Sequence, residues 1–121
     1  MNYQETQYDI VIVGAGAAGI SVAASLLARK NGLRMALIDP ADTHYYQPGF
    51  TMIGGGIFTS DEVKRPMQSL IPKGVTWIQA GVAGFQPDDN TVTLEDGTLI
   101  AYQRLIVCPG IKLNWDGIEG L

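Results

Sequence analysis

The chain has 121 residues, of which 46% are hydrophobic and 17% charged, so it can bury one core but is too short for two independent domains. Its formal net charge of -4 argues against nucleic-acid binding, and its single cysteine excludes an intrachain disulfide or a cysteine-cluster metal site. The acidic start and the lack of a membrane-spanning apolar run predict a cytoplasmic protein.

The first third of the chain predicts a strand, a helix and a second strand. Residues 8–13 form a short apolar run rich in β-branched residues, which indicates a buried strand. From Ile20 apolar residues recur at helical spacing, and Gly32 is placed to stop the helix. Residues 33–38 are again apolar, so the segment 8–39 is predicted to be a βαβ unit with parallel strands.

The rest of the chain predicts a loop, a short helix and several strands. Residues 40–60 lack periodicity, which predicts an extended loop with a turn or two, and Pro66 can begin a short helix that ends near Ile71. Asp96-Gly97 predicts a hairpin turn. We expect strands at residues 75–79, 81–85, 91–94, 98–102 and 104–107. Because the chain ends soon afterwards, we expect the sheet to be incomplete there and the chain to be a fragment.

The turn between the first strand and the helix carries a glycine motif. Gly14, Gly16 and Gly19 satisfy G-x-G-x-x-G, the pattern of dinucleotide-binding loops. In such a loop Gly14 permits the tight bend, Gly16 lets backbone approach a pyrophosphate, and Gly19 lets helix and strand pack closely. The N–H groups at the start of the helix, at Ala17 and Ala18, would face the anion. The motif does not by itself distinguish FAD from NAD(P).

A carboxylate stands at the end of the second predicted strand. There Asp39 can accept hydrogen bonds from ribose hydroxyls, although an ordinary solvated carboxylate is the alternative. Its negative charge would repel a ribose 2′-phosphate, so NADP is the least favoured of the three dinucleotides.

Longer stretches of sequence resemble known families. Residues 9–19 (DIVIVGAGAAG) look like the opening of glutathione-reductase-type flavoproteins. More specifically, residues 44–51 (HYYQPGFT), the three glycines at 54–56 and residues 71–75 (IPKGV) resemble the sulfide:quinone oxidoreductases. The resemblance implies an α/β fold: a Rossmann-like FAD-binding domain whose parallel sheet carries an inserted β-meander at about 81–102, with residues 1–121 as its N-terminal part.

The resemblance also implies FAD as cofactor and a set of contacts. The glycine loop would take the pyrophosphate, Asp39 the adenosine ribose, Val82 the adenine through its main chain, and Pro48 the flavin side. The turn at 108–110 would bring backbone near the cofactor. The complete expected set is Gly14, Gly16, Ala17, Ala18, Gly19, Asp39, Pro40, Pro48, Val82, Cys108, Pro109 and Gly110.

For the full-length protein, the resemblance implies oxidation of sulfide with electron transfer through FAD to quinone. The catalytic cysteines would lie beyond Leu121, so no catalytic residue is expected in this chain and the chain alone would be inactive. A region beyond Leu121 could attach the protein to a membrane surface. Two alternatives stay open: a type II NADH:quinone dehydrogenase or other FAD/NAD(P)-dependent disulfide oxidoreductase, and a noncatalytic dinucleotide-binding module. The sequence does not predict the oligomeric state.

Four further side chains have competing interpretations. We expect His44 to be a loop residue bonded to backbone rather than a catalyst, because no acid/base partner is visible for it. Tyr45 and Tyr46 could anchor the loop by packing or contact the cofactor. Cys108 stands where the resembled family has a small non-thiol residue, and we interpret it as a buried space-filling side chain.

Overall fold

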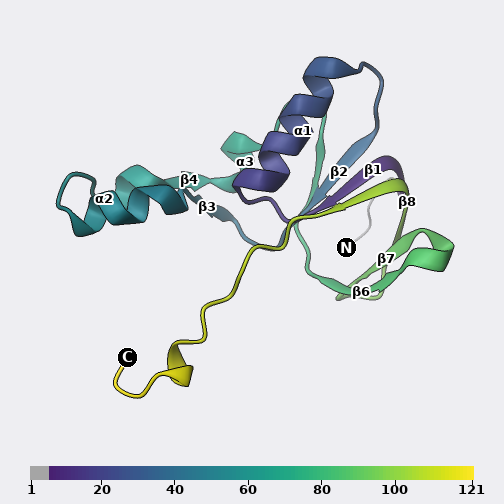
Figure 1. Cartoon of the computed structure of the whole chain (residues 1–121). Coiled ribbons are helices and arrows are strands. Elements are labelled where there is room, and N and C mark those ends of the chain that lie inside the picture. The colour runs from purple at the N-terminus through teal and green to yellow at the C-terminus, as the bar shows by residue number, and fades with distance from the viewer. Residues whose placement is uncertain (1–5) are drawn as a thin grey trace.

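A six-stranded sheet forms the centre of the molecule in the computed structural model, which describes residues 6–121 (Figure 1). In order across the sheet, its strands are β5 (Thr76–Ile78), β2 (Met35–Ile38), β1 (Gln7–Val13), β8 (Leu99–Val107), β7 (Thr91–Leu94) and β6 (Val82–Gln86). The strands from β5 to β8 pair in parallel, whereas β7 and β6 are antiparallel. The predicted α/β class with a largely parallel sheet is therefore confirmed.

Strand β1 is buried on both faces, which explains its nearly continuous apolar sequence. Ile10 and Ile12 face the helix α1 (Ala17–Arg29) and pack in one cluster, whose other buried members are Ala15, Ala23, Met35, Leu37 and Met67. Val11 and Val13 face the opposite side and belong to a second cluster, with Tyr8, Ala36, Ile38, Ile78, Val92, Leu94 and Ile100. The alternation along β1 and β2 thus supplies both layers of the core.

Helix α1 begins at Ala17, three residues before Ile20, where the apolar periodicity of the sequence begins. Gly16 is its N-cap residue, so Ala17, Ala18 and Gly19 form the first turn. These small residues carry no periodic signal, which is why the apolar pattern located the helix only from its first large side chain. The helix ends at Arg29, where the Lys30 N–H donates to the Leu26 carbonyl.

The predicted β-meander is present as β6, β7 and the first part of β8. The Asp96-Gly97 turn lies between β7 and β8 as predicted: Gly97 has φ +87°, and the Thr98 N–H donates to Asp96 Oδ1 at 2.9 Å. The prediction of separate strands at 98–102 and 104–107 is wrong, because β8 runs unbroken from 99 to 107. Its first residues pair with β7, and from Ala101 onward it pairs with β1.

Residues 43–66 form an arm beside the sheet, and the predicted irregular loop at 40–60 is wrong there (Figure 1). The arm begins with β3 (Thr43–Tyr45) and ends with β4 (Lys64–Pro66), which pair antiparallel. Between them lie a 3-10 helix at Gln47–Gly49, helix α2 (Phe50–Gly54) and a second 3-10 helix at Ser60–Val63. These elements are too short to produce a periodic sequence pattern.

The second 3-10 helix is held by its own capping box. The Thr59 N–H donates to the Glu62 carboxylate at 2.5 Å, and the Thr59 side chain accepts from the Glu62 N–H in return. The predicted helix at 66–71 is one turn, α3 (Met67–Leu70), and Pro66 is its N-cap residue rather than its first helical residue. Pro66 instead ends β4. The next residue, Met67, donates its N–H to the Asp42 carbonyl at 2.8 Å, just before β3 begins.

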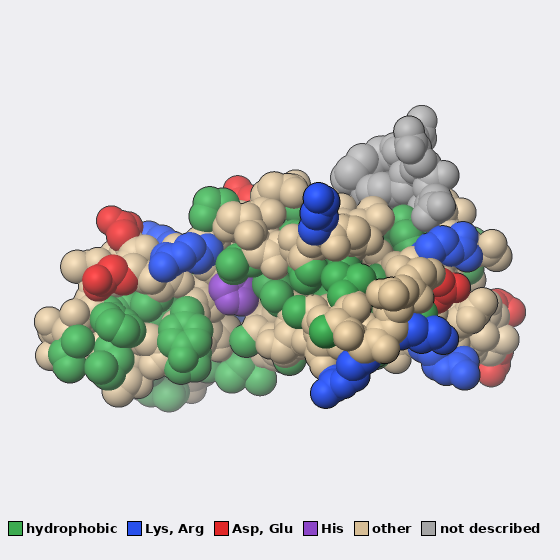
Figure 2. All heavy atoms as spheres, turned by 90° about the horizontal axis from the view of Figure 1, so that it is seen from above, with side chains coloured by type: hydrophobic (Ala, Val, Ile, Leu, Met, Phe, Trp, Pro, Cys, Tyr) green, Lys and Arg blue, Asp and Glu red, His purple; other side chains and the backbone are tan. Residues whose placement is uncertain are grey.

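Hydrophobic side chains gather on the surface at the α2 end of the molecule (Figure 2). The exposed members within the arm are Tyr45, Tyr46, Phe50, Met52, Ile57 and Phe58. Within residues 6–121, no helix has both the length and the apolar character needed to cross a bilayer.

Candidate functional site

The glycine loop lies at the carboxyl end of β1, and two of its glycines are required by the packing of the chain itself. Gly14 has φ +100°, and a Cβ there would overlap the carbonyl oxygen of Cys108. Gly19 is buried, and a Cβ there would overlap the carbonyl oxygen of Gly14. Neither position can carry a side chain without moving backbone.

Gly16 is different, because nothing in the described chain requires a glycine there. Its backbone is extended (φ -73°, ψ -168°), a conformation open to any residue, and a Cβ would meet no atom within 4 Å. Gly16 is the N-cap residue of α1, and no side chain caps the N–H groups of that helix. The empty space and the unpaired donors therefore coincide, which is the arrangement that an anion at a helix N-terminus needs.

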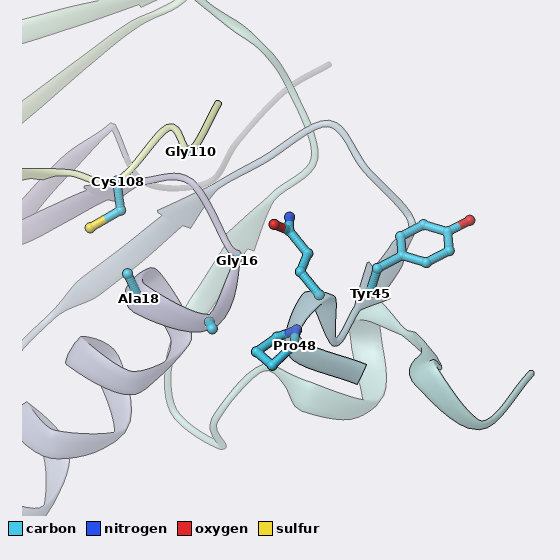
Figure 3. A pocket seen from close by; sticks show the side chains of 8 residues that line it. Gly16, Ala18, Tyr45, Pro48, Cys108 and Gly110 are labelled. Atoms are coloured by element: carbon cyan, nitrogen blue, oxygen red, sulfur yellow. The ribbon is translucent and has the colours of Figure 1, made fainter. Parts of the chain in front are cut away.

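A cavity of about 430 Å³ opens in front of this loop (Figure 3). Its lining residues come from the glycine loop, the arm and the turn after β8: Gly16, Ala17, Ala18, Tyr45, Gln47, Pro48, Cys108 and Gly110. A narrower hollow of about 190 Å³ shares Gly16, Cys108 and Gly110 with this cavity and extends to Asp39 and Pro109. We call the two together the loop groove; it runs from Asp39 past the glycine loop to Pro48.

The Asp39 carboxylate fastens the glycine loop to the end of β2. Its Oδ2 accepts the Ala15 N–H and its Oδ1 accepts the Ala41 N–H, both at 2.8 Å. The peptide of Asp39 is fixed as well, since its N–H donates to the Ile78 carbonyl and its own carbonyl accepts the Trp77 indole N–H, each at 3.1 Å. Because a carboxylate oxygen can accept more than one hydrogen bond, Asp39 keeps acceptor capacity toward the groove.

Cys108 is half-buried and lines the loop groove, so its interpretation as a buried space-filling residue is wrong. Its side chain points toward the start of α1, where Ala18 lies (Figure 3). Its N–H donates to the Val13 carbonyl at 2.7 Å, which continues the β1–β8 pairing by one residue. Because β8 and β1 are parallel and end at the same edge, the residue after β8 emerges beside the glycine loop.

The arm supplies the opposite wall of the groove. Tyr45 and Gln47 line both of its parts, and Pro48 lines the larger part. Tyr45 is 46% exposed, and its ring packs edge-on against Phe50, with ring centroids 6.4 Å apart. Gln47 had no signal in the sequence beyond its position before Pro48, so the sequence reasoning missed it.

His44 also belongs to this wall, and it contacts the loop directly. Its Nδ1 lies 3.2 Å from the Ala15 carbonyl oxygen, so the expected bond to backbone is confirmed, although His44 lies in strand β3 rather than in a loop. Tyr46 lines a second cavity of about 530 Å³ together with His44, Phe58 and Arg65.

Four predicted contact residues lie outside the groove lining: Gly14 and Gly19, which lie against the backbone of the chain itself, and Val82 and Pro40. Val82 is half-buried in β6 and packs against the core cluster that contains Val92 and Leu94. Pro40 is exposed, and its carbonyl accepts the Gln79 side-chain amide at 3.4 Å. The predicted adenine contact of Val82 and the predicted cofactor contact of Pro40 stay predictions.

The groove has little side-chain charge. Asp39 is the one carboxylate in its lining, and neither of its two parts is lined by Lys or Arg. An anion bound there would be held by backbone N–H groups and by the positive end of the α1 dipole.

Comparison with known proteins gives a consistent result. Residues 8–121 match the family model described as pyridine nucleotide-disulphide oxidoreductase. The mitochondrial sulfide:quinone oxidoreductase of Dictyostelium discoideum is 43% identical over 93% of this chain, and that of Mus musculus is 36% identical over 97%. The X-ray structure of the sulfide:quinone oxidoreductase from Aquifex aeolicus superposes on 92% of the chain with a TM-score of 0.79 and 28% identity. The chain spans about a quarter of these proteins: 25%, 26% and 26% of their respective lengths.

Proposed function

Because the chain belongs to the pyridine nucleotide-disulphide oxidoreductase family, a family of FAD-binding flavoproteins, we propose that the loop groove binds FAD in an enzyme that oxidises sulfide and reduces quinone. Gly16 carries this proposal. Its missing side chain leaves open the space in front of the uncapped N-terminus of α1, and no contact within residues 6–121 explains that space. A diphosphate is a group that such a cradle of backbone donors would hold.

Some residues at the groove would shape the glycine loop, and others would contact the cofactor. Gly14 and Gly19 shape the loop, and the backbone of Gly16, Ala17 and Ala18 would bind the pyrophosphate. Asp39 would accept the ribose hydroxyls at one end of the groove while it holds the loop through the Ala15 N–H.

The remaining predicted residues would contact the other parts of the cofactor. Pro48 and the Cys108–Pro109–Gly110 turn would lie along the cofactor toward its flavin end, and Pro40 and Val82 toward its adenine end. Bound FAD would supply the electron chemistry, taking electrons from a donor and passing them to an acceptor. The chain would orient the cofactor along the end of the sheet. It would hold the diphosphate through backbone N–H groups and without basic side chains.

Sulfide and quinone are proposed from the similarity to the two mitochondrial sulfide:quinone oxidoreductases and the one from Aquifex aeolicus. The NADH:quinone dehydrogenase alternative and the noncatalytic alternative are not better supported than this proposal. Attachment to a membrane surface would accompany a quinone substrate, which is dissolved in the bilayer.

The test uses the full-length protein purified with its bound flavin. We expect sulfide, and not NADH, to bleach the flavin absorbance, and a short-chain quinone to restore it. If NADH and not sulfide bleached the flavin, NADH would replace sulfide as the proposed electron donor, and the proposal of FAD as cofactor would stand. A correctly folded protein that neither contains nor takes up FAD would overturn the proposed cofactor.

A further inference from the structure

The peptide groups on either side of Ala15 are tied down by two side chains from distant parts of the sequence. Ala15 is fully buried in the middle of the glycine loop. Its N–H donates to Asp39 Oδ2 at 2.8 Å, and its carbonyl oxygen lies 3.2 Å from His44 Nδ1. Since a carbonyl oxygen can only accept, Nδ1 carries the proton in this contact. The end of β2 and the arm thus hold the same loop residue from its two polar atoms.

The His44 contact also determines the direction of the next N–H. The peptide bond is planar and trans, so the carbonyl of Ala15 and the N–H of Gly16 point in opposite directions. With the carbonyl held by His44, the Gly16 N–H points away from the His44 side chain. This N–H has no hydrogen-bond acceptor among residues 6–121, and Gly16 lines both parts of the loop groove.

We propose that His44 is a positioning residue for the dinucleotide: it holds the Ala15–Gly16 peptide in the orientation that presents the Gly16 N–H to the diphosphate. This inference rests on the proposed binding of FAD in the same groove. His44 touches the loop and not the reacting atoms, so its contribution is preorganisation of a donor before the cofactor arrives. It also links cofactor binding to the arm, because His44 pairs with Arg65 across β3 and β4.

Three substitutions of His44 separate the hydrogen bond from the bulk of the ring. In His44→Asn the amide nitrogen is as many bonds from Cα as Nδ1 is, so the donor to Ala15 is retained. In His44→Gln the amide nitrogen stands one bond further out, and in His44→Ala the donor is absent. Arg65→Ala is the matched control: it loosens the arm at the facing position, where the Arg65 side chain donates to the Glu62 and Lys64 carbonyls, without touching Ala15.

FAD dissociation constants are measured by flavin fluorescence on folded apoprotein, with the unfolded fraction of each variant determined by circular dichroism and corrected for. We expect about tenfold weaker binding in His44→Ala and His44→Gln, and binding within about twofold of wild type in His44→Asn and Arg65→Ala, because one oriented hydrogen-bond donor is lost or kept. The ³¹P resonances of bound FAD should shift in His44→Ala and return in His44→Asn.

The outcomes distinguish this inference from the proposed function. Wild-type protein that does not bind FAD would refute the binding of FAD itself. If wild type binds, equal affinity in all variants overturns the role of His44, as does a loss in His44→Asn equal to that in His44→Ala. A loss in Arg65→Ala as large as that in His44→Ala would also overturn it, because the stability of the arm rather than the hydrogen bond would then control binding.

Discussion

The same glycine-to-alanine substitution, made at two positions two residues apart in the glycine loop, should affect two different properties of the protein. In Gly14→Ala the new methyl group would overlap the Cys108 carbonyl, and alanine would have to adopt φ +100°. In Gly16→Ala the methyl group would enter open space with an ordinary backbone conformation. Gly14→Ala should therefore damage the fold, whereas Gly16→Ala should damage cofactor binding.

The magnitudes follow from these contacts. Gly14→Ala combines about 1–2 kcal/mol of backbone strain with about 1–3 kcal/mol for forcing backbone apart, so we expect a loss of roughly 2–5 kcal/mol in the free energy of unfolding. Gly16→Ala should cost at most about 1 kcal/mol, since alanine is a poorer N-cap residue than glycine. If its methyl group displaces the diphosphate from one charge-assisted hydrogen bond, worth about 1.5–3 kcal/mol, FAD should bind roughly 10- to 100-fold more weakly.

Urea unfolding of the apoproteins and FAD titration of the folded proteins measure the two effects separately. We expect Gly14→Ala to lower the urea midpoint strongly, and Gly16→Ala to leave it nearly unchanged while weakening FAD binding. Wild-type FAD affinity in Gly16→Ala would falsify the idea that Gly16 is kept free for the diphosphate. A loss of stability in Gly16→Ala as large as in Gly14→Ala would show instead that the chain itself fills that space.

Three further predictions concern Asp39, Asp96 and Cys108. Asp39→Asn should destabilise the apoprotein by about 1–3 kcal/mol in urea unfolding, because one amide oxygen cannot replace two carboxylate oxygens that each accept a backbone N–H; an unchanged midpoint would contradict its role in fastening the loop. Hydrogen bonds from the Thr98 N–H and side chain hold the pKa of Asp96 below its usual value, so its stabilisation of the hairpin is present above the pKa of the unfolded chain, near 4, and is lost as pH falls through the folded-state pKa. Asp96→Asn should therefore lose less stability than wild type between about pH 5 and pH 2, and parallel losses would refute this. Alkylation of Cys108 by iodoacetamide, followed by mass spectrometry, should be slowed by FAD, and Cys108→Ala should still bind FAD; equal alkylation rates with and without FAD would place the thiol outside the cofactor site.

The sequence by itself determined the first βαβ unit, the glycine loop and the hairpin. These features depend on local chemistry. Strands buried on both faces have nearly continuous apolar sequences, and a tight strand-to-helix bend with φ +100° at Gly14 requires glycine. The end of β2 could also be predicted from the sequence, because Asp39 follows directly after a buried apolar run. The Asp96-Gly97 turn was found for the same reason, since turn residues act through their own backbone conformation.

Only the tertiary structure decided the arm and the full lining of the groove. The elements between β3 and β4 are short and depend on contacts with each other, so no local periodicity marks them. Cys108 lines the same groove as Tyr45 and Gln47 because β8, far along the chain, pairs beside β1 and ends at the same edge of the sheet. The motif predicted a different role for each of its three glycines, but only the folded chain shows the contacts behind those roles. Gly14 and Gly19 lie against its own backbone and Gly16 faces open space, because steric contact depends on neighbours that only folding brings together.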